Sequence, residues 1–111
     1  MTILRVSIET VASDESSVLL ALRGEFDLEN VSILRIALAD HINRGRCVIR
    51  LDMSGVEYMD STTMGAFVEA RQACHDKGGA LILTRAPDRV RQVLRMGGLD
   101  GLLADSADSQ A

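Results

Sequence analysis

The side chains best suited to chemistry stand together in one short stretch, Asp60-Ser61-Thr62-Thr63. An aspartate and three hydroxyls come directly before an apolar helical pattern, and Ser61 is the best candidate for the N-cap of that helix. A hydroxyl there faces unpaired backbone N–H groups and the positive end of the helix dipole, an environment that suits a covalent phosphate. A plain capping serine, with Asp60 as a loop acid, is the alternative on physical grounds alone.

An enzymatic use of these residues is a further alternative. Asp27, Asp52 and Asp60 could join Ser61 in an acid cluster for phosphoryl transfer, or Ser61 could be a nucleophile with a neighbouring base. No Gly-x-Ser-x-Gly elbow, P-loop or Cys/His pair accompanies them, and neither histidine is close to Ser61 in the sequence. We therefore expect a protein that has no catalytic residues and needs no cofactor.

The cysteines and histidines do not indicate a metal site. Cys47 and Cys74 lack CxxC spacing, and His41 and His75 each stand near the end of a predicted helix, where a cation suits the dipole. We interpret the two thiols as reduced, mostly buried hydrophobic side chains, with a disulfide as the alternative.

The length and composition are those of one soluble domain. A chain of 111 residues can bury one core, and 47% hydrophobic with 25% charged residues is typical of globular proteins. The net charge of −4 and the pI near 5.0 would repel phosphate backbones, so we do not expect nucleic acid as a partner. Arg5 and Glu9 interrupt the apolar stretch that a signal peptide needs, and no run approaches the roughly 20 apolar residues of a membrane span. We expect a cytoplasmic protein without membrane insertion.

Hydrophobic periodicity predicts alternating strands and helices. The predicted strands cover residues 3–11, 18–23, 47–53 and 80–84, and the predicted helices cover residues 28–43, 61–77 and 87–96. Asp27 is expected to cap the first helix and Pro87 to open the last, with residues 54–60 as a loop. This order implies an α/β fold: a mostly parallel sheet of four to five strands, a hairpin of the first two strands at one edge, and helices after strands two, three and four.

The domain is expected to span residues 1–104. Leu99, Leu102 and Leu103 can make a short final apolar contact at its end. Residues 105–111 are small and polar, and they are expected to form a flexible C-terminal tail.

Three stretches together resemble one known family. Residues 23–27 (Arg-Gly-Glu-Phe-Asp), residues 51–61 (Leu-Asp-Met-Ser-Gly-Val-Glu-Tyr-Met-Asp-Ser) and residues 95–99 (Arg-Met-Gly-Gly-Leu) are similar to the STAS domain family, named for sulfate transporters and anti-sigma-factor antagonists. The second stretch is specific, and the order and separation of all three strengthen the match, which runs from about residue 18 to residue 103. The resemblance implies the STAS fold and a protein of the anti-sigma-factor antagonist type.

The resemblance also implies a site. In the antagonist members the serine directly after the loop aspartate accepts a phosphate, and here that residue is Ser61, with Thr62 as the fallback. Asp27 matches an acid at the end of the second strand, close to the phosphorylation loop. Thr63 departs from the family pattern, which usually has glycine there, and its β-branched side chain adds bulk and stiffens the first helical turn. The residues expected to contact a partner are Glu25, Asp27, Asp60, Ser61, Thr62, Thr63 and Met64.

The function implied by the resemblance is a protein-binding switch. The unphosphorylated domain would bind an anti-sigma factor, itself a serine kinase, and so release a sigma factor; phosphorylation at Ser61 would end the binding, and a PP2C-type phosphatase would reset it. We expect a monomer or weak dimer. The alternative is a STAS subunit of a lipid-transport ABC complex or of a stress-signalling assembly.

Overall fold

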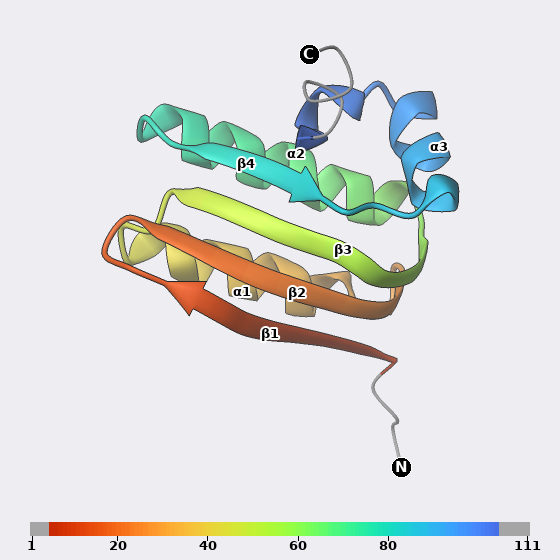
Figure 1. The fold of residues 1–111 in the computed structure, drawn as a ribbon, viewed down its shortest axis with the longest axis horizontal. Coiled ribbons are helices and arrows are strands. Elements are labelled where there is room, and N and C mark those ends of the chain that lie inside the picture. Colours follow the sequence, from red (N-terminus) through yellow and green to blue (C-terminus); the bar gives the residue numbers. More distant parts are fainter. Residues whose placement is uncertain (1–4, 105–111) are drawn as a thin grey trace.

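The computed structural model describes residues 5–104, and its elements follow the predicted order. They are β1 (Val6–Ser13), β2 (Ser17–Phe26), α1 (Val31–Asn43), β3 (Val48–Met59), α2 (Ser61–Asp76), β4 (Ala80–Thr84), α3 (Asp88–Met96) and the 3-10 helix η1 (Asp100–Leu102). The strand order in the sheet is β1-β2-β3-β4, with β1 and β2 antiparallel and the other neighbours parallel. This arrangement confirms the predicted α/β fold with a hairpin at one edge (Figure 1).

The core lies between the sheet and the two longer helices, α1 and α2, which both lie behind the sheet in Figure 1. Alternate residues along β2 and β3 are buried because successive side chains of a strand point to opposite faces. The buried set in these strands includes Val18, Leu20, Leu22, Ile49, Leu51 and Met53. From the helices, Leu34 and Phe67 are fully buried in the same cluster. Removing each such side chain from water contributes about 1.5–3 kcal/mol, so this layer holds the helices in place on the sheet.

β3 is longer than the sequence pattern indicates. Residues 54–60 were predicted to form a loop, but the strand continues to Met59, and this prediction is wrong for all but the last residue. The reason is that Val56 and Met59 are buried three residues apart, a spacing that breaks strict alternation. Irregularities in the pairing of β2 with β3, one of them between Gly24 and Glu25, shift the register and accommodate that spacing.

α1 begins later than predicted. The helix starts at Val31 rather than residue 28, because residues 27–30 form a turn in which the Asn30 and Val31 N–H groups both donate to the Asp27 carbonyl oxygen. The prediction that Asp27 caps this helix is wrong: Asn30 occupies the N-cap position, and no side chain caps it. Similarly, Pro87 is the residue before α3 rather than its first residue.

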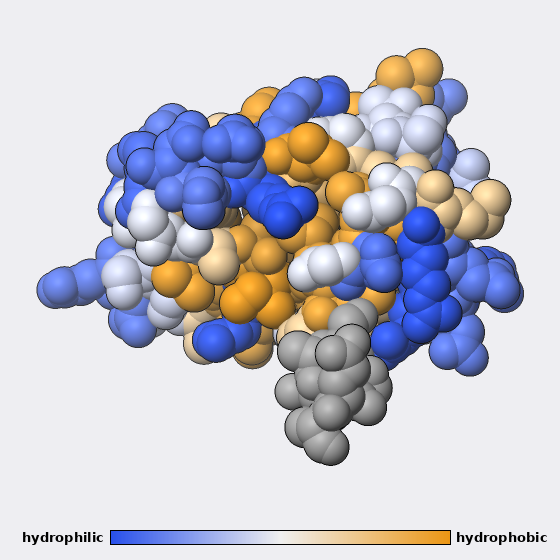
Figure 2. Space-filling model, turned by 90° about the horizontal axis from the view of Figure 1, so that it is seen from above, coloured by the Kyte–Doolittle hydropathy of each residue, from blue (hydrophilic) through white to orange (hydrophobic). Residues whose placement is uncertain are grey.

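The edge of the sheet formed by β4 is covered by the last described segment. Leu99, Leu102 and Leu103 are buried, and Leu103 forms a parallel bridge with Leu83 of β4, which confirms the predicted final apolar contact. Seen from this side, hydrophobic side chains gather in the middle of the view, with hydrophilic ones around them (Figure 2). The predicted start of the first strand at residue 3 and the predicted tail, residues 105–111, lie outside the described residues.

Candidate functional site

The predicted site residues converge at one end of the sheet, where β2 and β3 both finish. Phe26 pairs with Met59 in the parallel ladder, so Asp27 and Asp60 each follow a residue of the same pair. The hydroxyl of Thr63, in the first turn of α2, lies 3.0 Å from the Phe26 carbonyl oxygen and donates to it. The C-terminal ends of neighbouring parallel strands lie at the same edge of a sheet. The expected proximity of the Asp27 and Ser61 segments is therefore present.

Asp60, not Ser61, is the N-cap of α2. Its backbone is extended, and its Oδ1 accepts a hydrogen bond of 3.0 Å from the Thr63 N–H. Ser61 is consequently the first residue of the helix, and the prediction that it serves as the cap is wrong. Aspartate and serine cap helices about equally well, so residue type alone could not distinguish the two positions. Because Asp60 satisfies the helix end, the Ser61 hydroxyl has no capping role and no hydrogen-bond partner within residues 5–104.

The three consecutive hydroxyls differ sharply in accessibility. Ser61 is exposed, Thr62 is half-buried, and Thr63 is only 1% exposed. The Thr63 hydroxyl also lies 3.1 Å from Asp60 Oδ1, so it stands between two acceptors inside the protein. Of these three hydroxyls, Ser61 is the most accessible to another protein. The bulk that Thr63 adds in place of the glycine usual in the family pattern points into the domain.

Asp27 belongs to a surface ion-pair cluster. Arg5 donates from Nη2 to Asp27 Oδ2 and lies 3.9 Å from Glu25 and 3.5 Å from Glu29. Asp27 Oδ1 also accepts a hydrogen bond from the Glu29 N–H. The hydrogen bond from Arg5 holds the pKa of the Asp27 carboxyl below its ordinary value, and desolvation partly opposes this. Sequence analysis did not single out Arg5, because an arginine on the polar side of an edge strand carries no distinguishing signal.

The first turn of α2 also borders α3. Met64, half-buried, points its thioether toward the C-terminal end of α3, where a Cβ added to Gly97 would lie 2.7 Å from the Met64 sulfur. Tyr58, two residues before Asp60, is 48% exposed, and Leu28, after Asp27, is 72% exposed. The predicted site residues are thus bordered by apolar side chains. The sequence pattern did not point to Tyr58, because it predicted a loop there and said nothing of the exposure of that side chain.

The remaining chemically active side chains lie elsewhere. Cys47 and Cys74 are both free and buried, as interpreted, and burial raises the pKa of the Cys74 thiol. Desolvation lowers the pKa of His41, at the far end of α1. No helix among residues 5–104 is both long and apolar enough to cross a membrane.

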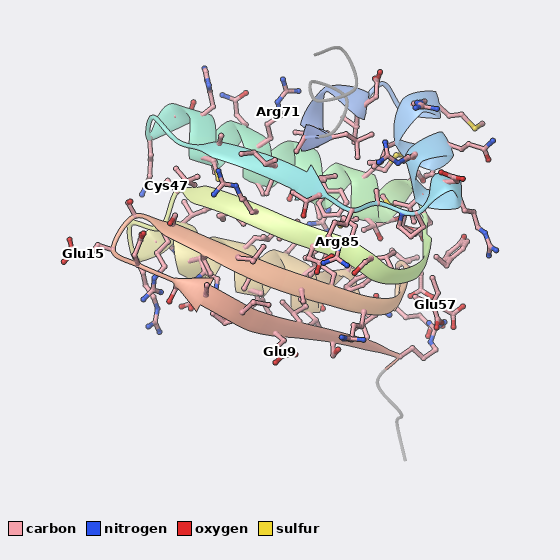
Figure 3. The ribbon with its side chains drawn as sticks, in the orientation of Figure 1. Glu9, Glu15, Cys47, Glu57, Arg71 and Arg85 are labelled. Atoms are coloured by element: carbon pink, nitrogen blue, oxygen red, sulfur yellow. The ribbon has the colours of Figure 1, made fainter. Side chains whose placement is uncertain are left out.

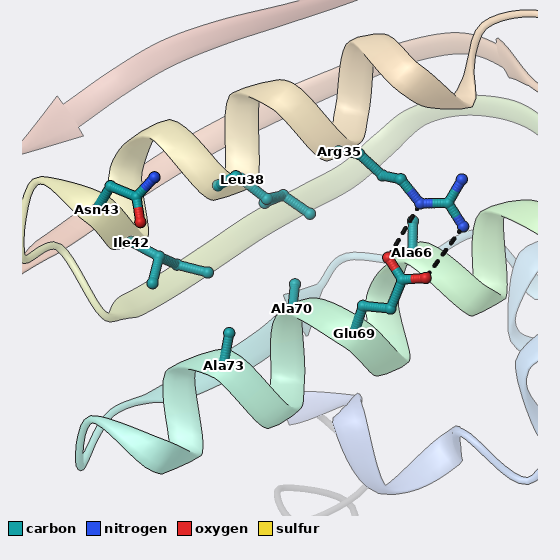
Figure 4. A pocket seen from close by; sticks show the side chains of 9 residues that line it. Arg35, Leu38, Ile42, Asn43, Ala66, Glu69, Ala70 and Ala73 are labelled. Atoms are coloured by element: carbon teal, nitrogen blue, oxygen red, sulfur yellow. Dashed lines mark hydrogen bonds and ion pairs between the residues drawn. The ribbon is translucent and has the colours of Figure 1, made fainter.

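A groove between α1 and α2 is distinct from the Ser61 end. Leu38, Ala66 and Ala70 are among its lining residues. At one end Arg35 makes two hydrogen bonds to the Glu69 carboxylate, of 3.0 and 3.3 Å (Figure 4). This ion pair bridges the two helices over the groove, and none of the predicted site residues lines it.

Comparison with known proteins shows which proteins this chain resembles. A family model described as Mlab, STAS domain matches residues 9–104. The anti-sigma-B factor antagonists of Listeria monocytogenes and Bacillus subtilis are 28% and 29% identical to this chain over 100 residues. Each alignment covers 90% of this chain; it covers 88% of the Listeria protein and 91% of the Bacillus protein. The solved structure of the anti-sigma factor antagonist SpoIIAA in its unphosphorylated form has a TM-score of 0.76 at 23% identity, covering 95% of this chain and 94% of that one. An anti-sigma factor antagonist from Mycobacterium paratuberculosis has a TM-score of 0.77 at 16% identity, covering 89% and 83%. At these identities the structural matches support the fold alone.

Proposed function

The chain belongs to the STAS domain family, and we propose that it is an anti-sigma-factor antagonist switched by phosphorylation of Ser61. In this proposal the unphosphorylated form binds an anti-sigma factor that is also a serine kinase, and a sigma factor is released. The names of the Listeria and Bacillus relatives support the role. The observation that carries the switch is the position of Ser61: exposed, at the first residue of α2, and freed from capping by Asp60.

The covalent step needs only the hydroxyl of this chain and the kinase's ATP. The Ser61 Oγ attacks the γ-phosphorus, a new O–P bond forms, the bond from that phosphorus to the β–γ bridging oxygen breaks, and ADP leaves. The hydroxyl proton passes to a base of the kinase. A PP2C-type phosphatase would reverse the modification by hydrolysis and release inorganic phosphate.

Charge explains how the phosphate ends the binding. A phosphoserine adds about −1.5 to −2 charges at neutral pH, here beside Asp60 and at the strand end that carries Glu25 and Asp27. In the free domain the phosphate faces water and the positive end of α2, so the fold tolerates it. In a complex it would be desolvated beside carboxylates. Since every 1.4 kcal/mol weakens binding about tenfold, a buried unpaired charge is enough to separate the proteins without a change of fold.

Phosphosite mapping tests the proposal. The purified chain is incubated with ATP and an anti-sigma serine kinase from the same organism, and peptide mass spectrometry should place a single phosphate on Ser61. Incubation with ATP alone should give none, which separates a passive substrate from an enzyme. Thr62 is the fallback; a phosphate found only on Thr63, no phosphate with a competent kinase, or a chain that binds an ABC-transporter component and no kinase would contradict the proposal.

A further inference from the structure

α3 is a basic surface on an acidic protein. The helix, Asp88–Met96, contains three arginines and one aspartate, a net charge of +2, whereas the whole chain carries −4. Val90 and Leu94 hold the helix against the core, and the exposed residues on its outer face are Asp88, Arg89, Gln92, Arg95 and Met96. Neither Arg89 nor Arg95 has a side-chain hydrogen bond or ion pair within residues 5–104. Asp88 and Glu57 lie near Arg89, but neither forms an ion pair with these two arginines in the described part of the chain, so both guanidinium groups are open to a partner.

This surface adjoins the Ser61 site. Arg89, Tyr58 and Glu57 line one depression where α3 lies against the end of β3, and Glu57 projects from this end of the molecule (Figure 3). The two apolar side chains beside the arginines are unusually open: Tyr58 is 48% exposed and Met96 is 88% exposed. Tyrosine, methionine and arginine are the residue types enriched in protein interfaces. Arg85, by contrast, lies over the open face of the sheet, 3.8 Å from Asp52, and is not part of this surface (Figure 3).

The charges on the two sides of Ser61 have opposite signs. Glu25 lies near the end of β2, Asp27 and Glu29 follow it, and all three lie within 4 Å of the Arg5 guanidinium. The end of β3 leads into Ser61, and β4, the next strand in the sheet, leads into α3. A partner that covers this end must therefore meet an acidic flank on one side and a basic flank on the other. Complementary charges across an interface raise the association rate and determine the orientation of docking.

We propose that the outer face of α3, with Tyr58, is a second docking surface, and that it binds an acidic segment of the anti-sigma partner. The proposal rests on the proposed function for the identity of that partner. Arg89 and Arg95 attract the carboxylates, while Tyr58 and Met96 supply apolar contact. The acidic flank and Ser61 bind elsewhere on the same partner, so α3 sets the orientation in which the partner approaches Ser61.

The test compares two variants that each remove two positive charges. R89Q/R95Q changes the α3 surface, and R71Q/K77Q is the matched control, with both positions exposed on or just after the C-terminal half of α2. These control positions are ten and sixteen residues beyond Ser61, about 15 and 24 Å along the helix axis. Thermal melts check that both variants fold. The association rate with an anti-sigma serine kinase from the same organism, without ATP, should fall about tenfold at low salt for R89Q/R95Q and less than twofold for the control. Equal rates for the two variants would overturn the proposal.

A second measurement separates this proposal from the proposed function. NMR titration with an octaglutamate peptide should shift the amide signals of α3 in the wild type and not in R89Q/R95Q. If no anti-sigma kinase binds the wild type, the proposed function fails. The α3 proposal then also fails, because its partner is wrong, even if the peptide binds. If the wild type binds the kinase and S61D does not, the proposed function stands. The association rate of R89Q/R95Q alone then decides whether the outer face of α3 binds the kinase. A chain truncated after Ala104 that binds octaglutamate more tightly would assign the surface to residues 105–111, which include Asp105 and Asp108, and would overturn the proposal.

Discussion

Replacing Thr63 with valine removes one buried hydroxyl and leaves the shape of the side chain almost unchanged. That hydroxyl donates to the Phe26 carbonyl oxygen at 3.0 Å and is 1% exposed, so water cannot replace it. Losing the partner of a buried acceptor costs about 1–3 kcal/mol. A small part of this free-energy cost is avoided, because Asp60 Oδ1, 3.1 Å from the hydroxyl, keeps its hydrogen bond from the Thr63 N–H. We expect T63V to lower the free energy of unfolding by about 2 kcal/mol.

Urea unfolding followed by circular dichroism measures this change, and two variants serve as controls. T63S keeps the hydroxyl and loses one buried methyl, for about 0.8 kcal/mol. T62V removes a hydroxyl that has no hydrogen-bond partner within residues 5–104 and should leave stability within about 0.5 kcal/mol of wild type. A T63V protein as stable as T62V would refute the reasoning, because it would show that the bond to Phe26 does not hold α2 against the end of β2.

Three further predictions concern the neighbouring acids and the serine. S61D should fold normally but bind the anti-sigma kinase at least tenfold more weakly than S61A in titration calorimetry, and equal affinities would show that charge at this position does not control binding. D60A should lose about 0.5–2 kcal/mol of stability in urea, whereas D60N should lose little, since asparagine caps a helix about as well as aspartate. The Asp27 carboxyl has a lowered pKa in the folded state. The stability that its charge contributes is therefore fully present above its unfolded pKa of about 3.9 and is lost as the pH falls through the folded pKa. Wild type should therefore lose more stability than D27N on acidification from pH 6 to pH 2.5, and parallel curves would contradict the role of the ion pair with Arg5.

Much of the fold follows from local patterns that the sequence displays directly. Strict alternation in the middle of β2 and β3, and helical spacing in α2, are enough to place those elements and their order. The order then restricts the sheet to a mostly parallel arrangement with an antiparallel hairpin. Convergence of Asp27 and Ser61 follows from the same topology. These predictions succeed because each depends on burial along one element or on chain direction.

The predictions that fail depend on contacts between elements. The continuation of β3 to Met59 requires the irregular pairing with β2, and no pattern within residues 54–60 shows it. The late start of α1 also depends on contacts that no local pattern shows. The side-chain amide of Asn30 donates to the Glu25 carbonyl oxygen at 2.8 Å, and its Oδ1 accepts from the Asp27 N–H. Arg5 was missed for this reason too, since its partners are more than nineteen positions away in the chain.

The choice of Asp60 over Ser61 as the cap has the largest consequence for function. If Ser61 capped α2, its hydroxyl would be engaged with a backbone N–H, and phosphorylation would have to break that bond. With Asp60 as the cap and Thr63 fastened to Phe26, the helix end is complete before any modification occurs. The Ser61 hydroxyl can then be changed without loss of a structural contact. Stability and switching are thus assigned to different residues, which is why S61D is expected to fold normally while D60A and T63V are not expected to keep full stability.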